Sequence, residues 1–126
     1  MSWGFTIPGQ PISGNHANKI GRGYARGGRT FPKLVKTAEA EAYQTTVALI
    51  VRTAKPSGWV WPGTYFEVRY RFFLIDPVDA DNCLKVLNDG SFPALGVDDR
   101  WCLPHVVSIQ SGVPPDEARV EVTIDA

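Results

Sequence analysis

Residues 64–90 read TYFEVRYRFFLIDPVDADNCLKVLNDG, and this stretch contains both kinds of secondary structure from which the fold is predicted. Between Tyr65 and Leu74 every second side chain is apolar, which is the period of a β-strand with one buried face. After the strand, Leu84 and Leu87 lie at helical spacing and predict a short helix over about 79–89. The chain is therefore predicted to pack strands against helices.

The remainder of the chain adds one long helix and three further strands. The segment WGFTIPG (3–9) predicts a first strand, and the Gly-rich, basic stretch after it predicts a loop that stays mobile until something orders it. A proline suited to a first turn and helically spaced apolar residues predict a helix over about 32–55. Residues 105–112 and 118–126 predict two more strands, joined as a hairpin by the turn GVPPDE. With 126 residues, 44% apolar content and no repeat or linker, we expect one α+β domain with a mixed β-sheet over the whole chain.

The formal net charge of the chain is zero, but the charges are unevenly distributed. Residues 1–36 contain six basic side chains and no Asp or Glu, which gives +6. Residues 76–126 contain ten acids and three bases, which gives −7, and the segment between them is +1. Either the two ends attract each other in the fold, or the basic segment contacts phosphates while the carboxylates hold metal ions. The charge pattern gives these two interpretations equal weight.

The cysteines and histidines do not predict a structural zinc site. Cys83 and Cys102 form no CxxC pair, and His16 and His105 are the only histidines, so both thiols are expected to be reduced and metal-free. The N-terminal residues lack the long apolar run of a signal peptide, and no segment approaches membrane-spanning length. We therefore expect a protein of the cytoplasm without a membrane partner.

Asp79 and Asp81 precede the apolar positions of the predicted short helix. In one interpretation Asp79 is the N-cap and Asp81 lies in the first turn, where the helix dipole favours a negative charge. In the other, the junction between strand and helix turns both carboxylates towards one point, where their oxygens would suit Mg²⁺ or Mn²⁺. Each aspartate alone fits a cap better, whereas the pair also fits a metal site.

Three further polar residues share this segment. Asn82 adds an amide at the helix start, and Lys85 lies four residues from both Asp81 and Asp89, so one helix face reads Asp, Lys, Asp. As a structural feature this is a ladder of surface ion pairs with little energetic weight. As a functional feature, Lys85 would stabilise the charge that develops in phosphoryl transfer. The spacing alone does not decide between the two.

The sequence GVDDR (96–100) contains a second acidic feature, the adjacent residues Asp98 and Asp99. Adjacent carboxylates repel each other, so a fold that keeps both ionised surrounds them with cations, hydrogen bonds or water. The doublet is either a solvated turn, or one of its members completes the metal site begun by Asp79 and Asp81. Two common motifs are excluded, because the first acidic segment lacks the EF-hand glycine and the Gly-rich basic segment lacks the ending of a P-loop.

The combination of DADNCLKVLNDG (79–90) with GVDDR (96–100) resembles the D-x-D-N-x-x-K…D…DD signature of RusA-like Holliday junction resolvases. The segment IPGQPISGNHANK (7–19) is similar to the opening strand and Asn-containing turn of that family, so the resemblance covers most of the chain. It implies a RusA-like fold and a small homodimeric, Mg²⁺-dependent endodeoxyribonuclease, often phage-encoded. Such enzymes resolve four-way DNA junctions by paired symmetric nicks in DNA recombination and repair.

Residue by residue, the resemblance assigns metal binding and catalysis to Asp79, Asp81 and Asp99, and an essential catalytic role to Lys85. Relatives commonly carry basic residues directly before the first aspartate, where this chain has residues 76–78, DPV, so a DNA contact at that point is not carried over. The possible supporting residues are Asn82, Asp89 and Asp98.

The basic segment would supply what an acidic site cannot, because carboxylates repel DNA until metal ions and basic side chains compensate them. Bound Mg²⁺, for which Mn²⁺ would substitute, would activate a water and neutralise the leaving oxygen. A homodimer would present two sites for two symmetric cuts. The alternative function is a catalytically inactive protein that binds branched DNA, and a third interpretation is a globular protein whose acids only cap and pair a helix. We assign the phosphate contacts to Lys19, Arg22, Arg26 and Arg29.

Overall fold

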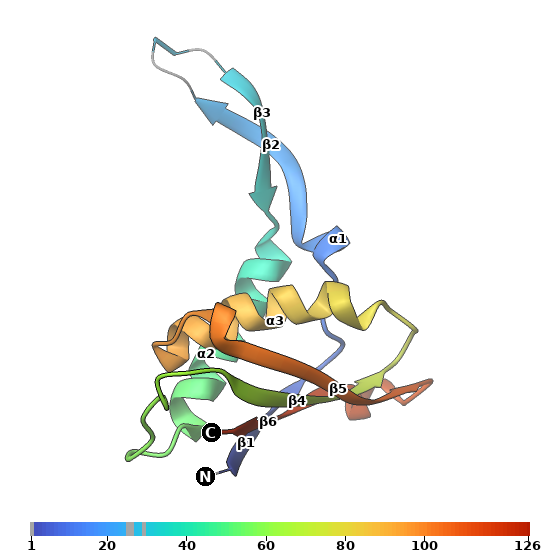
Figure 1. Ribbon diagram of the computed structural model, residues 1–126. Helices are drawn as coiled ribbons and strands as arrows, with labels where there is room; N and C mark the ends of the chain where they lie inside the picture. Colours follow the sequence, from blue (N-terminus) through green and yellow to red (C-terminus); the bar gives the residue numbers. More distant parts are fainter. Residues whose placement is uncertain (1, 25–26, 29) are drawn as a thin grey trace.

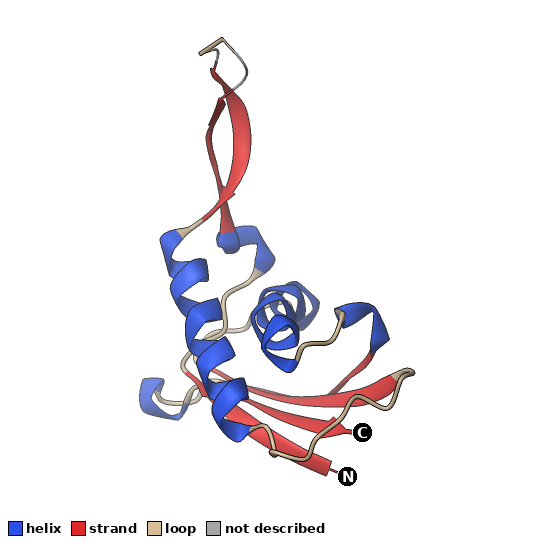
Figure 2. Cartoon of the chain, turned by 90° about the vertical axis from the view of Figure 1, so that its left-hand side faces the viewer, coloured by secondary structure: helices blue, strands red, loops and turns tan. Residues whose placement is uncertain are grey.

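The computed structural model describes residues 2–24, 27–28 and 30–126. Its body is a four-stranded β-sheet covered on one face by two helices, and a two-stranded ribbon stands apart from this body (Figures 1 and 2). The predicted α+β domain with a mixed sheet is confirmed. The elements are, in chain order, β1 (Ser2–Pro8), α1 (Gly14–Ala17), β2 (Asn18–Tyr24), β3 (Thr30–Lys36), α2 (Ala38–Ala54), β4 (Phe66–Leu74), α3 (Ala80–Leu95), the 3-10 turn η1 (Asp99–Trp101), β5 (Cys102–Ser111), the 3-10 turn η2 (Pro115–Glu117) and β6 (Arg119–Asp125).

The body sheet has the strand order β1-β6-β4-β5. β4 runs parallel to β5 and antiparallel to β6, while β1 pairs antiparallel with β6. α3 connects β4 to β5, because parallel neighbours need a crossover connection. The predicted hairpin between the last two strands is wrong: β4 lies between β5 and β6, so residues 112–117 carry the chain across the sheet instead of joining neighbours.

The predicted alternation in β4 is confirmed, because its five inward side chains are buried and the side chains between them are half-buried. The inward side chains of the sheet form one core with Val47 and Val51 of α2 and Leu87 of α3. The two helices approach most closely at Gly90, where an added Cβ would lie 3.1 Å from the Cα of Gln44. Glycine at this position therefore sets how closely α3 packs on α2.

The long helix is shorter than predicted. α2 begins at Ala38, and residues 32–36, which the sequence predicts as its first turns because of Pro32, belong to β3. Pro32 lies opposite Arg22 in the antiparallel pair of β2 and β3, so it is a strand residue. The helix begins instead at Thr37, whose Oγ1 accepts a hydrogen bond from the backbone N–H three residues later at 3.2 Å.

Residues 18–24 of the Gly-rich segment predicted to be a loop form β2, which pairs with β3 in a ribbon, so the loop prediction is wrong for these residues. Gly21 permits the pairing, because an added Cβ would lie 2.7 Å from a methyl carbon of Val35. The ribbon projects from the end of the body where α2 begins, with α1 at its base (Figures 1 and 2). α1 in turn contacts α3, so the base of the ribbon adjoins the helix that carries the first acidic segment.

The short helix is longer than predicted. α3 starts as expected, with Asp79 as its N-cap, but it continues past the predicted end to Leu95. Phe92 and Leu95 are buried, and their burial offsets the cost of having Pro93 inside the helix. Gly96 ends the helix with a φ of 76°, a left-handed conformation that glycine adopts readily. Among the described residues, no helix is long and apolar enough to cross a membrane.

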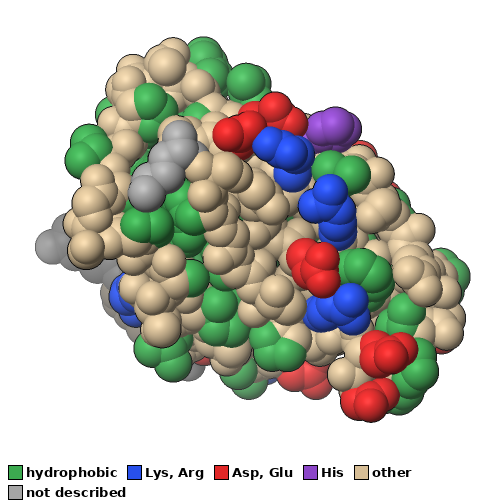
Figure 3. Space-filling view, turned by 90° about the horizontal axis from the view of Figure 1, so that it is seen from below, with side chains coloured by type: hydrophobic (Ala, Val, Ile, Leu, Met, Phe, Trp, Pro, Cys, Tyr) green, Lys and Arg blue, Asp and Glu red, His purple; other side chains and the backbone are tan. Residues whose placement is uncertain are grey.

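The open face of the sheet carries charged side chains of both signs. Arg69 Nη2 lies 2.6 Å from Asp125 Oδ2, and Arg119 Nε lies 2.9 Å from Glu121 Oε2. Figure 3 shows basic and acidic side chains lying next to one another across this face. Charges of both signs therefore lie close together, so the face does not present one sign of charge to a partner.

Candidate functional site

The start of α3 places Asp79 and Asp81 at an exposed corner of the body. Asp79 Oδ1 accepts a hydrogen bond from the backbone N–H of Asp81 at 3.0 Å, which confirms the predicted N-cap. Asp81 lies in the first turn, where the helix dipole favours its charge. Asn82 is half-buried in the same turn. Because both aspartates are exposed, capping is compatible with binding a ligand at this corner.

The middle of α3 carries an ion pair on its outer face. Lys85 Nζ lies 3.6 Å from Asp89 Oδ1, one turn further along the helix. The Lys85 side chain is 77% exposed, so the pair is a surface interaction of small energetic weight. Of the predicted ladder of ion pairs, the pair between Lys85 and Asp89 is observed. Lys85 also keeps its charge accessible to an anion.

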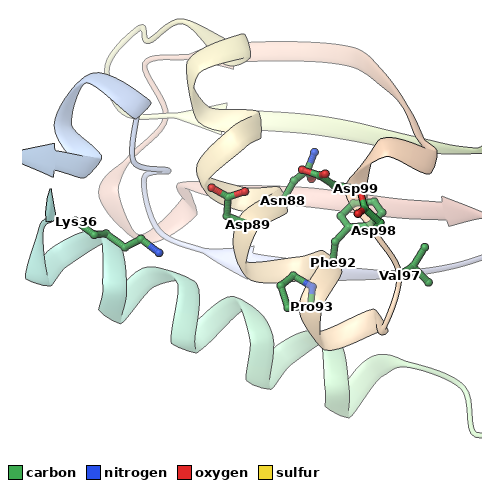
Figure 4. A pocket seen from close by; sticks show the side chains of 8 residues that line it. All are labelled: Lys36, Asn88, Asp89, Phe92, Pro93, Val97, Asp98 and Asp99. Carbon is green, nitrogen blue, oxygen red and sulfur yellow. The ribbon is translucent and has the colours of Figure 1, made fainter. Parts of the chain in front are cut away.

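The second half of α3 borders a cavity of about 340 Å³. Figure 4 shows Lys36 reaching towards Asp89 from one side, while Asp98 and Asp99 lie on the turn that follows α3. Lys36 Nζ also donates a hydrogen bond to Gln44 Oε1 of α2. Pro93 has no N–H for the carbonyl of Asp89, so this wall of the cavity has one helical hydrogen bond fewer. The lining residues are Lys36, Asn88, Asp89, Phe92, Pro93, Val97, Asp98 and Asp99.

The two members of the acidic doublet have different surroundings. Asp98 accepts hydrogen bonds from the backbone N–H and the guanidinium of Arg100, at 2.9 Å and 3.1 Å. The hydrogen bonds and charge of Arg100 hold the pKa of Asp98 below its usual value. Asp98 therefore organises the turn η1, which leaves Asp99 as the better candidate for contact with a ligand in the cavity.

A buried tyrosine supports the cavity from below. The Tyr70 hydroxyl donates to Asn88 Oδ1 at 2.7 Å and lies 3.8 Å from Cys102 Sγ. Burial raises the pKa of Tyr70, so the hydroxyl keeps its proton and can donate it. Because the Asn88 side-chain oxygen accepts this hydrogen bond, the N–H groups of the Asn88 amide can donate to a ligand in the cavity. This support was not predicted, because Tyr70 was read only as a core residue of a strand.

The predicted metal ligands lie at two places along α3. Within the described part of the chain, no group of three or more His, Cys, Asp or Glu side chains is placed to hold a metal ion. Asp81 and Asp89 are eight residues apart, which is about 12 Å along a helix, and Asp89 shares its cavity with Asp99. Ligands of Mg²⁺ all lie about 2.1 Å from the ion. Joint metal binding by Asp79, Asp81 and Asp99 stays a prediction.

The predicted DNA contacts belong to the ribbon. Lys19 is exposed on β2, and Arg22 lies on the same strand. Arg26 and Arg29 lie outside the described residues. Lys36, which is not among the four predicted DNA contacts, ends β3 and lines the acidic cavity, a position that follows from the corrected start of α2.

Comparison of the chain with protein-family models and with curated proteins finds no match. The resemblance to RusA-like resolvases therefore rests on the residues quoted above, and it stays a prediction.

Proposed function

We propose that the protein is an endonuclease that cuts branched DNA, four-way junctions in particular, with Mg²⁺ as its cofactor and a homodimer as its working form. The observation that carries the proposal is the position of a basic ribbon close to the helix that carries the first acids: β2 and β3 lie in a segment of charge +6 without acids, and α1, at the base of the ribbon, contacts α3. A nuclease needs basic side chains that bind the DNA phosphates close to a site that hydrolyses a phosphodiester bond.

The dimensions of the ribbon support a contact with DNA. Seven residues in each strand span about 24 Å, and a two-stranded ribbon can enter the major groove, which is about 12 Å wide. Lys19 and Arg22, on β2, would neutralise phosphates along that path. The open face of the sheet is a poorer candidate, because its basic side chains lie among acidic ones.

The residues of α3 and of η1 would act on the strand that the ribbon positions. Lys85 is exposed and would stabilise negative charge on a phosphate. Asp81 at the start of α3 and Asp99 near its end are separate candidates for the cation that this chemistry needs. Each is tested by a substitution of its own.

The test is cleavage of a synthetic four-way junction by the purified protein. With Mg²⁺ we expect two nicks at symmetric positions, with Mn²⁺ the same products, and with EDTA none. Tight, salt-sensitive binding of the junction without cleavage under any divalent cation would contradict the proposal and favour the alternative, a branched-DNA-binding protein without catalysis.

A further inference from the structure

Three aromatic side chains meet at the edge of the body, where the loop between α2 and β4 lies against η1. The ring centroids of Trp61 and Trp101 are 5.4 Å apart. Those of Tyr65 and Trp101 are 5.1 Å apart, with the rings inclined by 65°. These separations are typical of favourable aromatic contacts, so the three rings support one another.

The outermost ring of this group is left open to solvent. Tyr65 is 56% exposed, whereas Trp61 and Trp101 are half-buried against the core. Trp61 Nε1 donates a hydrogen bond to the carbonyl of Thr64 at 3.0 Å, which fixes the loop directly before Tyr65. The position of Tyr65 is therefore set by its neighbours, while its ring remains available for contact. A preorganised, exposed aromatic ring is a feature of binding surfaces.

The aromatic group adjoins the acidic cavity. Trp101 ends the turn η1 that begins at Asp99, and Asp99 lines the cavity. Arg100 stands between them in the chain, with a side chain that is 69% exposed. Trp101 therefore follows the cavity-lining Asp99 by two residues within one turn, and its ring contacts Tyr65.

We propose that Tyr65, supported by Trp101, is a stacking platform for an unpaired base of the DNA strand that enters the acidic cavity. The proposal rests on the proposed function, because it takes DNA as the ligand of that cavity. Every base has a flat face that can stack on an aromatic ring. In a duplex both faces are covered by neighbouring base pairs, so the platform would accept bases only at a branch point or in a single strand. It would add selectivity for branched DNA to the charge-based binding of the ribbon.

The platform is tested by binding, with Ca²⁺ in place of Mg²⁺, so that the readout needs no cleavage while a cation still compensates the carboxylates of the cavity. The probes are a forked DNA with 2-aminopurine at the first unpaired position and a duplex of the same length. Two variants distinguish stacking on the aromatic ring from burial of apolar surface. Tyr65→Phe keeps the ring, and Tyr65→Leu replaces it by an apolar side chain without a ring. Leu49→Ala is the matched control, because Leu49 is an apolar side chain of similar exposure, 63%, on α2. Thermal unfolding of each variant checks that the fold is kept.

We expect the wild type to quench 2-aminopurine fluorescence on binding the fork. Tyr65→Leu should weaken fork binding about fivefold to 100-fold, leave duplex binding unchanged and abolish the quenching. Tyr65→Phe and Leu49→Ala should behave as the wild type. Equal weakening of fork and duplex by Tyr65→Leu, or fork binding without quenching by the wild type, would overturn the platform. Ring-dependent binding without cleavage in Mg²⁺ would support the platform and overturn only the proposed nuclease.

Discussion

Asp98 and Asp99 are neighbours in the chain, but the structure uses them differently. Asp98 accepts two hydrogen bonds from Arg100 and thereby shapes η1, whereas Asp99 is the first residue of that turn and lines the cavity. The sequence pattern DDR shows that a cation is close, but it does not say which carboxylate the cation holds. Local hydrogen bonding decides this, and it makes Asp99 the residue to test for function.

Because Arg100 hydrogen-bonds to Asp98, the free energy of unfolding is expected to depend on the ionisation of Asp98. The pKa of Asp98 is lowered in the folded state, so its contribution is present above the unfolded value and is lost as the pH falls through the folded value. Urea unfolding of the wild type and of Asp98→Asn between pH 2 and pH 7 measures it. The wild type should be the more stable at neutral pH, and the difference should shrink below about pH 4. A difference that persists unchanged to pH 2 would contradict this account.

The thiol of Cys83 should react unusually slowly. Burial, with a smaller contribution from the charge of Asp79, raises the pKa of Cys83 to about 11, and only the thiolate is nucleophilic. In a Cys102→Ala background, alkylation of the native protein should accelerate as the pH approaches 11. In urea the rise should occur near the ordinary thiol value of about 8.5. The same midpoint in both states would show that the thiol is not shielded.

The raised pKa of Cys83 also makes the stability of the protein depend on pH. Because the folded pKa of Cys83 is the higher one, the stability from burying the neutral thiol is complete below the pKa of the unfolded thiol. It is lost as the pH rises from about 9 towards 11.

At the scale of elements, the boundary between β3 and α2 depends on one hydroxyl group. Thr37 Oγ1 accepts the hydrogen bond that begins α2, and loss of such a cap costs about 1 kcal/mol. Thr37→Ala should lower the free energy of unfolding by about that amount. Thr45→Ala is the matched control, because Thr45 is exposed inside the same helix and bonds only to the carbonyl of Glu41. A loss of stability as large in Thr45→Ala as in Thr37→Ala would argue against the cap.

The ribbon carries a prediction about salt. Each phosphate contact changes the slope of log K against log salt concentration by about 0.9. Replacing Lys19 and Arg22 by glutamine should therefore reduce the slope for junction binding by about 2. The control is the double replacement of Arg52 and Lys55, which removes the same charge near the far end of α2. Equal effects of the two double variants would show that only net charge matters, not the ribbon.

The strand and helix types were largely readable from the sequence, whereas two of their boundaries were not. The alternation in residues 66–74 and the cap at Asp79 depend on local rules, and both are confirmed. The C-terminal end of α3 and the start of α2 depend on tertiary contacts. Burial of Phe92 extends α3 through Pro93, and Pro32 pairs with a residue of the neighbouring strand. Proline and glycine mark such boundaries only when packing does not compete with them.

The candidate site was readable in part for the same reason. Spacing along one helix identified Asp79, Asp81 and Lys85 as neighbours in the chain. Two members of the cavity could not be found in this way, because Lys36 arrives from the ribbon and Asn88 is oriented by Tyr70 across the core. Contacts between elements far apart in sequence leave no local pattern.

At the scale of the whole molecule, the separation of charge has a structural counterpart. The ion pairs of the described side chains join residues of the segment 67–125 to one another. The acidic part of the chain is thus partly neutralised by its own bases, and the basic segment forms a separate projection (Figure 1).

The most direct test of the central claim compares three single variants in cleavage of one four-way junction with Mg²⁺. Asp81→Asn and Asp99→Asn each remove a carboxylate from one of the two acidic places along α3. Asp116→Asn removes an exposed carboxylate from η2, which lies outside both. The account predicts that each of the first two variants lowers the cleavage rate by about 100-fold or more while still binding the junction, and that Asp116→Asn matches the wild type. Undiminished cleavage by Asp81→Asn and Asp99→Asn would contradict it.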